Sequence, residues 1–264
     1  MINLTRRQWL LGAGAVAFLG GSYVWTQYRH ALSAAERRIA GKSMVVSAPS
    51  GPIEYAVAGD GPPLLMIHGT GGGFDQGLLF AGALMRRGYR IAAPSRYGYL
   101  RSGFPADTSF ANQADSFAHL LDHLGIDRLP VIGGSAGALS ASAFALRHPA
   151  RCSALVLLVP ACNVDGRDPV AMGAAQEKAV RALLASDFLY WSLLHTAPET
   201  LIGNLLATDP ALLPTVDASE RARAFAILST MMPIAARAKG MLNDAYQAGH
   251  PAELDLPGSN RRSF

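Results

Sequence analysis

The stretch LPVIGGSAGALSAS, residues 129–142, decides the fold of this chain. It begins with a short apolar run typical of a buried strand and ends in an alanine-rich run typical of a helix. Between them lies the pattern Gly-x-Ser-x-Gly, with Ser135 at its centre. A serine on a tight turn between a strand and a helix projects its hydroxyl above the sheet, at a helix N-terminus that favours negative charge. The stretch therefore predicts that Ser135 is a nucleophile.

A second glycine-rich segment, HGTGGG at residues 68–73, directly follows an apolar run. Acyl transfer builds negative charge on an oxygen, and backbone N–H groups held in place stabilise that oxyanion. We predict the amide of Ala136 as one donor and the amide of Thr70 as the second, with the amide of Gly71 as the alternative. His68 stands at the end of the expected strand and leads the loop, which favours a role in fixing the loop over a role as catalytic base.

Strand-like and helix-like segments alternate along the body of the chain, and a segment of helices alone follows. The alternation predicts right-handed crossovers and a mostly parallel, doubly wound α/β sheet. The helices-only segment, residues 163–250, is typical of a lid inserted over the carboxyl edge of the sheet. The expected strands are residues 42–47, 52–58, 63–67, 89–93, 129–132 and 154–159. The expected helices are residues 76–87, 110–124, 138–148, 174–185, 188–195, 198–206 and 220–246, the last with a break near residue 233.

Taken in order, the HGTGGG loop, the segment APSRYGY at residues 93–99 and the Ser135 turn resemble the α/β-hydrolase superfamily, in its serine esterase, lipase and haloperoxidase-like group. The resemblance covers residues 43–257. It implies hydrolysis without a cofactor. A serine nucleophile, where some relatives use aspartate, indicates acyl transfer and a small apolar ester-like substrate.

The same resemblance implies a triad in the order Ser, Asp or Glu, His. Asp165 is the candidate acid, with Asp168 as the neighbouring alternative, because both follow the sixth expected strand. No base is identified, and His195 and His250 are the histidines worth testing as substitutes. Residues 251–264 look like a truncated or aberrant tail, so we expect the family's seventh and eighth strands to be missing and the sixth strand to form an open apolar edge that recruits other chains.

Two hypotheses about activity follow. The first is a serine hydrolase of esterase type whose activity is doubtful in this form, because a serine without a paired base is a poor nucleophile. The second is a non-catalytic, membrane-attached remnant or binding protein of the same fold.

The N-terminal segment has a different character from the body. Residues 8–28 carry no charge and would span about 31 Å as a helix, close to the thickness of a bilayer core. Arg6 and Arg7 before this run resemble a twin-arginine export signal. We expect an exported protein on the periplasmic side of the cytoplasmic membrane, either anchored or released after cleavage. The expected division is a signal or anchor with linker (1–42), a hydrolase core (43–162), a lid (163–250) and a tail (251–264).

Charge and cysteine content limit the partners. Six of the 23 basic residues but only one of the 19 acidic residues lie in residues 1–42, so the net charge of +4 belongs to that segment. No basic and aromatic face is visible in the body, so we expect no nucleic-acid partner. Cys152 and Cys162 flank an expected strand and would lie roughly 30 Å apart, too far for a disulfide. Two isolated cysteines also argue against a metal site.

Overall fold

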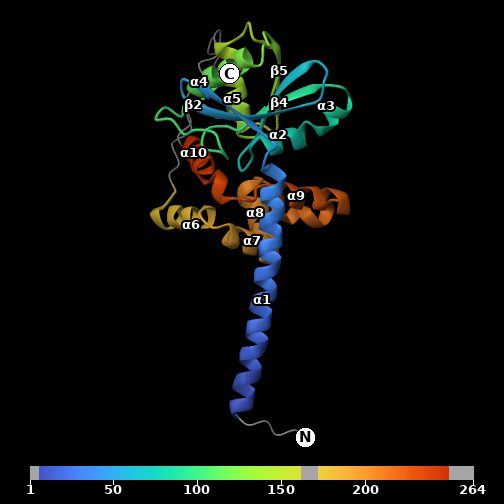
Figure 1. Ribbon diagram of the computed structural model, residues 1–264, viewed down its shortest axis with the longest axis vertical. Helices are drawn as coiled ribbons and strands as arrows, with labels where there is room; N and C mark the ends of the chain where they lie inside the picture. The colour runs from blue at the N-terminus through green and yellow to red at the C-terminus, as the bar shows by residue number, and fades with distance from the viewer. Residues whose placement is uncertain (1–5, 162–171, 250–264) are drawn as a thin grey trace, which may run out of the picture.

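The computed structural model describes residues 6–161 and 172–249. One sheet forms the centre of the body, with its strands in the order β1-β2-β4-β3-β5-β6 (Figure 1). β1 and β2 pair antiparallel to each other and β2 pairs antiparallel to β4, whereas β4, β3, β5 and β6 run parallel. The predicted mostly parallel α/β sheet is confirmed. The strand bounds are Met44–Ala48, Gly51–Ala58, Pro63–Ile67, Arg90–Pro94, Leu129–Gly134 and Cys152–Leu158 for β1 to β6.

Helices cover both faces of the sheet, which explains the uninterrupted apolar run of β3. Alternate residues of that strand point to opposite sides. Leu65 and Ile67 pack in the cluster formed with α4 (Phe110–His123) and α5 (Gly137–Arg147). Leu64 and Met66 pack in the cluster on the other face. That face is covered by α2 (Phe74–Phe80) and α3 (Gly82–Arg86).

The single helix predicted for residues 76–87 is wrong. Two short helices meet at Ala81, whose ψ of 2° departs from helical geometry. Ala81 is buried against the sheet, so the chain bends there to keep both helices on the same face.

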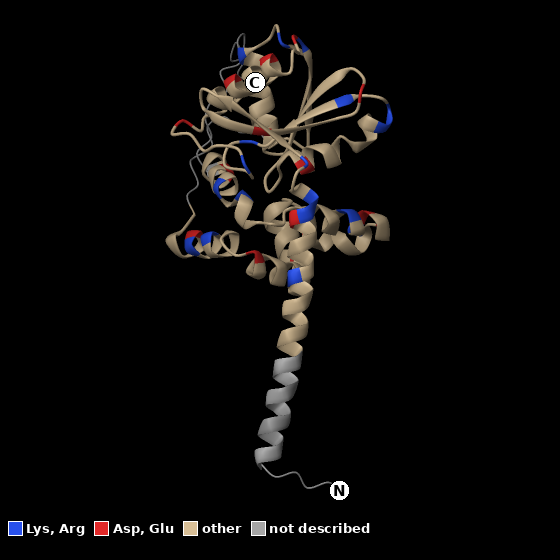
Figure 2. Cartoon of the chain, in the orientation of Figure 1, with Lys and Arg blue, Asp and Glu red and all other residues tan. Residues whose placement is uncertain are grey.

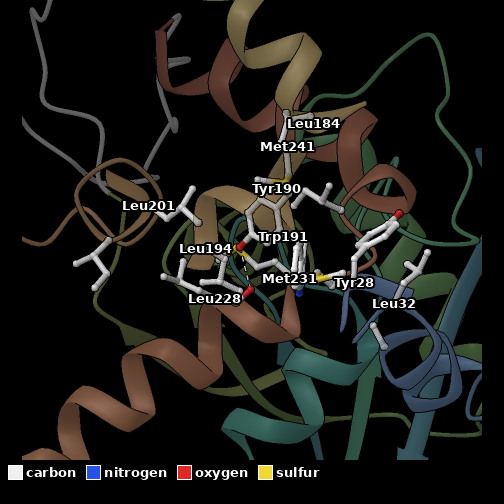
Figure 3. Packing of buried hydrophobic residues seen from close by; sticks show 14 of the residues in the cluster. Tyr28, Leu32, Leu184, Tyr190, Trp191, Leu194, Leu201, Leu228, Met231 and Met241 are labelled. Carbon is white, nitrogen blue, oxygen red and sulfur yellow. Dashed lines mark hydrogen bonds between the residues drawn. The ribbon is translucent and has the colours of Figure 1, made fainter. Parts of the chain in front are cut away.

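The segment after β6 forms a helical insert, and within its described residues the prediction of helices alone is confirmed. Tyr190, Trp191, Leu194 and Met231 meet at the centre of its core (Figure 3). The Tyr190 hydroxyl, buried among these side chains, donates a hydrogen bond to the carbonyl of Leu228 at 2.8 Å. The elements are α6 (Ala174–Leu184), α7 (Asp187–Thr196), α8 (Pro198–Leu205), α9 (Ala218–Thr230) and α10 (Ala238–Gly249), with 3₁₀ turns η1 (Pro210–Thr215) and η2 (Ala235–Arg237).

The N-terminal helix α1 (Arg6–Ile39) extends away from the body as a shaft (Figure 1). Its residues 20–28 carry no charged side chain (Figure 2). Toward its C-terminus it joins the insert, where Tyr28 and Leu32 are buried in the same core as Trp191 (Figure 3). The expected division sets residues 1–42 apart from the fold, but the last turns of α1 contribute to the core. Among the described residues, no helix meets the length and hydropathy expected of a bilayer span.

The outer strand β6 presents the open apolar edge that the sequence predicts. Leu155, Val156, Leu157 and Leu158 are each 39–42% exposed, and Val159 is 84% exposed. Within the described part of the chain, β6 pairs only with β5.

Candidate active site

Ser135 lies where β5 passes into α5, and its backbone is strained. Its φ is +50°, a left-handed conformation that a side chain disfavours. The side chain is exposed, while its backbone is held from both sides. The Ser135 amide donates to the carbonyl of Leu158 at 2.9 Å, and the Ser135 carbonyl accepts from Ala138 at 2.9 Å. A strained, exposed serine on a rigid turn has the geometry of a nucleophile elbow.

Close backbone contacts bring the turn against the end of β3. A Cβ atom at Gly137 would lie 2.3 Å from the carbonyl oxygen of His68, so no side chain fits there. A Cβ atom at Gly69 would lie 3.0 Å from the Cβ of Ser135. The glycine-rich loop, residues 68–73, therefore lies directly beside the serine.

The amides of this loop differ in what they bind. The Gly71 N–H donates to the hydroxyl of Tyr99, at 3.4 Å. The amides of Thr70 and Ala136 find no acceptor within residues 6–161 and 172–249. Among the described residues, two N–H groups beside the serine therefore have no acceptor, as an oxyanion site requires.

His68 is a structural residue of the loop. It is fully buried, its Nδ1 bonds to the carbonyl of Gly69 at 2.7 Å, and its Nε2 accepts the N–H of Arg96 at 2.9 Å. Burial and the nearby Arg96 charge lower the pKa of His68 well below 6.5, which keeps the imidazole neutral. The loop-fixing role expected from the sequence agrees with these contacts.

The other described histidines with recorded contacts are engaged away from Ser135. Nδ1 of His195 bonds to the carbonyl of Trp191 at 2.7 Å, on its own helix. His148 lies 2.9 Å from a carboxylate oxygen of Asp115, but it caps the C-terminus of α5. The 11 residues of that helix place it about 16 Å from the Ser135 end. Among the described residues, neither His195 nor His148 forms a hydrogen bond with Ser135.

Three other sequence candidates lie outside the described residues. They are Asp165, Asp168 and His250. Cys162 lies there too, and Cys152 is a free thiol. In the part of the chain that the structure describes, no group of three metal-ligating side chains comes together.

A buried polar cluster holds the glycine-rich loop and was missed at the sequence level. Asp244, on α10 of the insert, accepts two hydrogen bonds from the Arg96 guanidinium, at 2.7 and 2.6 Å. The same carboxylate accepts the hydroxyl of Tyr99 at 2.5 Å and the hydroxyl of Thr70 at 2.9 Å. The cluster connects the insert to the residues that surround Ser135.

The charges of this cluster balance. Burial alone would lower the pKa of Arg96, but the Asp244 carboxylate offsets this and raises it above the ordinary value. Burial and the Asp244 charge raise the pKa of Tyr99 well above 10, so its hydroxyl stays protonated and donates to Asp244. Arg96 and Tyr99 stand in the segment at residues 93–99 that the sequence singled out. No sequence pattern marks Asp244 as a partner of Arg96, because the two residues lie 148 positions apart.

Comparison with known proteins agrees with this architecture. The model of the alpha/beta hydrolase fold family matches residues 62–206. An uncharacterized hydrolase of Bacillus subtilis, YcgS, is 39% identical over 107 residues, which are 40% of this chain and 37% of YcgS. A 2-hydroxymuconate semialdehyde hydrolase of Pseudomonas putida is 38% identical over 104 residues, 38% of this chain and 37% of that protein. The matched region thus spans little more than a third of these relatives.

Solved structures share the fold. An alpha/beta hydrolase fold protein of Nakamurella multipartita superposes with a TM-score of 0.56 at 27% identity, over 78% of this chain and 74% of its own. Three findings lead to one assignment. The elbow serine lies between β5 and α5 of the sheet, the family model matches more than half of the chain, and the fold superposes on a solved member. The chain belongs to the alpha/beta hydrolase fold family.

Proposed function

We propose that this protein is a serine hydrolase that acts on an ester-like acyl substrate through Ser135. One observation carries the proposal: an exposed serine at φ +50° lies beside a glycine-rich loop, and two backbone N–H groups next to it have no acceptor in the described part of the chain. Relatives named as hydrolases support the general class.

In this mechanism, Oγ of Ser135 attacks the acyl carbonyl, and the carbonyl oxygen becomes an oxyanion. The amides of Ala136 and Thr70 stabilise it. The Gly71 amide is the weaker candidate, because it already has an acceptor in Tyr99. The N-terminus of α5 adds a partial positive charge at the same point.

The mechanism also needs a base for the Ser135 proton. The described histidines with recorded contacts bond elsewhere, so His250 is the histidine of this chain to test. Asp165 is the acid to test with it. A His250→Ala variant that keeps full activity would remove His250 from the mechanism.

The expected substrate has a small apolar acyl group, because the insert lies over the glycine-rich loop with apolar side chains. Met231, 1% exposed, packs so closely on Gly71 that a Cβ atom there would lie 2.6 Å from its Sδ. Turnover of short-chain p-nitrophenyl esters by the wild type and by Ser135→Ala tests the proposal. We expect release of p-nitrophenol by the wild type and background rates for the variant. Equal rates in the two proteins would exclude Ser135 as nucleophile.

The substrate panel has a second class to include. The Pseudomonas putida relative is named as a 2-hydroxymuconate semialdehyde hydrolase. Turnover of that compound without turnover of any ester would replace the ester assignment and keep the hydrolase assignment.

The alternative is a non-catalytic binding protein attached to a membrane through residues 8–28. A fluorophosphonate probe separates the two, because it reacts only with an activated serine. Labelling of folded wild type supports the hydrolase, and folded protein without labelling supports the binding protein. Export is tested separately: Arg6→Lys with Arg7→Lys should keep the protein in the cytoplasm if the pair is a twin-arginine address.

A further inference from the structure

The glycine-rich loop is fixed from the insert side by one buried carboxylate. We propose that Asp244 is a positioning residue that holds the loop at Ser135, so that docking of α10 completes the oxyanion site. This inference rests on the proposed function for its catalytic meaning, while its structural part can be tested without activity.

The contacts form a chain that leads from the insert to the loop amides. Asp244 Oδ2 accepts the Thr70 hydroxyl at 2.9 Å and the Tyr99 hydroxyl at 2.5 Å. Tyr99 in turn accepts the Gly71 N–H. The carboxylate thus holds the side chain of Thr70 directly and the backbone of Gly71 through one hydroxyl. Within residues 6–161 and 172–249 the Thr70 amide has no acceptor, so it can bind an oxyanion.

A carboxylate near a developing oxyanion would normally oppose it by charge repulsion. Here Arg96 forms two hydrogen bonds to Asp244, and both side chains are buried, with 4% and 6% exposure. Arg96 also donates from Nε to the carbonyl of His68 at 3.0 Å. The pair therefore carries no net charge toward the site and anchors the first residue of the loop as well as Thr70.

The loop needs such support because its own sequence gives it little stiffness. Gly71 has a φ of +74°, and residues 71–73 are all glycine. An oxyanion donor must be held close to its productive position, and a displacement of about 1 Å can cost about 100-fold in rate. Fixing by a buried hydrogen-bonded network supplies this rigidity.

The chain offers a matched pair of variants. Thr70→Val removes the hydroxyl that Asp244 binds and keeps the Arg96–Asp244 ion pair, so the fold should survive. Thr108→Val is the control, because Thr108 donates a bond of the same length, 2.9 Å, to Asn243, the neighbouring residue of α10. That bond does not touch the glycine-rich loop.

The first readout is the rate at which a fluorophosphonate reacts with Ser135 in the full chain. We expect Thr70→Val to lower the maximal reaction rate about 10-fold at unchanged half-saturating probe concentration, and Thr108→Val to stay within about twofold of wild type. Both variants should unfold at similar temperatures. Equal rates for the two variants, or a loss in Thr70→Val that appears only as weaker probe binding, would overturn the proposal.

The second readout is hydrogen exchange of the amides at residues 69–73, which needs no activity. We expect faster exchange there in Thr70→Val and in Tyr99→Phe than in wild type or Thr108→Val. Unchanged exchange would overturn the positioning role even in an active enzyme. Faster exchange in a protein that no probe labels would support the positioning of the loop and contradict the proposed function instead.

Discussion

The fully buried guanidinium of Arg237 pairs with the carboxylate of Asp75 through two contacts, at 2.8 and 3.0 Å. Arg237 comes from the insert and Asp75 from α2, the helix that follows the glycine-rich loop. Arg38 of α1 reaches the same carboxylate at 3.3 Å. One acid therefore connects the N-terminal helix, the hydrolase core and the insert.

This ion pair predicts a large loss of stability in Asp75→Asn. The variant leaves the Arg237 charge buried without a counter-charge, which costs about 3–5 kcal/mol. Asp115→Asn is the control, because Asp115 and its partner Arg147 are 44% and 49% exposed, and such pairs contribute less than about 1 kcal/mol. Urea unfolding measures both. Similar losses in the two variants would show that the buried pair has no special role.

His68 predicts how stability depends on pH. Its pKa in the folded protein lies well below the value of 6.5 expected when unfolded. Below pH 6.5 the unfolded chain therefore binds a proton that the folded protein does not, and stability falls as the pH falls. His68 contributes a slope that approaches about 1.4 kcal/mol of unfolding free energy per pH unit.

The test compares the unfolding free energies of wild type and His68→Asn between about pH 7.5 and about pH 5, a range that includes the unfolded-state pKa of His68. Asparagine keeps a donor for the Gly69 carbonyl and cannot titrate. We expect the unfolding free energy of the variant to depend less steeply on pH, because unfolding of the variant takes up nearly one proton fewer. Parallel curves would mean that His68 is not the titrating group.

The C-terminal part of α1 should contribute to the stability of the fold, whereas its exposed part should not. Tyr28 is 7% exposed and makes an edge contact with Phe188, with ring centroids 5.1 Å apart. Tyr28→Ala should lower the unfolding free energy by about 3 kcal/mol. Tyr23→Ala is the matched control, because Tyr23 is 67% exposed on the same helix. It should change the unfolding free energy by less than about 0.5 kcal/mol. Equal effects would contradict a core role for this end of the helix.

The open edge of β6 predicts self-association. Exposed apolar edge strands pair with other chains, and an edge charge opposes this. Val156→Lys should reduce the concentration-dependent growth in mass measured by light scattering. Leu212→Lys, on η1 at 51% exposure, is the control for an added charge elsewhere. A purified protein that is monomeric at all concentrations, or an equal effect of both lysines, would contradict the prediction.

The sequence predicted the sheet well because buried parallel strands leave a local signature. Every expected strand is present within two residues of its observed bounds, and the break near residue 233 separates α9 from α10. The bend at Ala81 was missed, because an apolar helical pattern continues through it. The sequence did not predict Asp244 and Arg237, the residues that position the site. Both bind residues more than 140 positions away, and such contacts leave no periodic pattern.

The site around Ser135 also has a part that the sequence predicts and a part that it does not. Its turn and neighbouring loop could be predicted from glycine spacing, because close backbone approach demands glycine locally. In the part of the chain that the structure describes, Tyr99 accepts the amide of Gly71, whereas the amides of Thr70 and Ala136 have no acceptor. These differences arise from tertiary contacts. They could be seen only in three dimensions.

The most direct test of Ser135 as the nucleophile is to map the adduct of a fluorophosphonate by mass spectrometry of proteolytic peptides. The account predicts one phosphonylated residue in the folded wild type, Ser135, and no adduct in Ser135→Ala. An adduct on another residue, or undiminished labelling of Ser135→Ala, would contradict it.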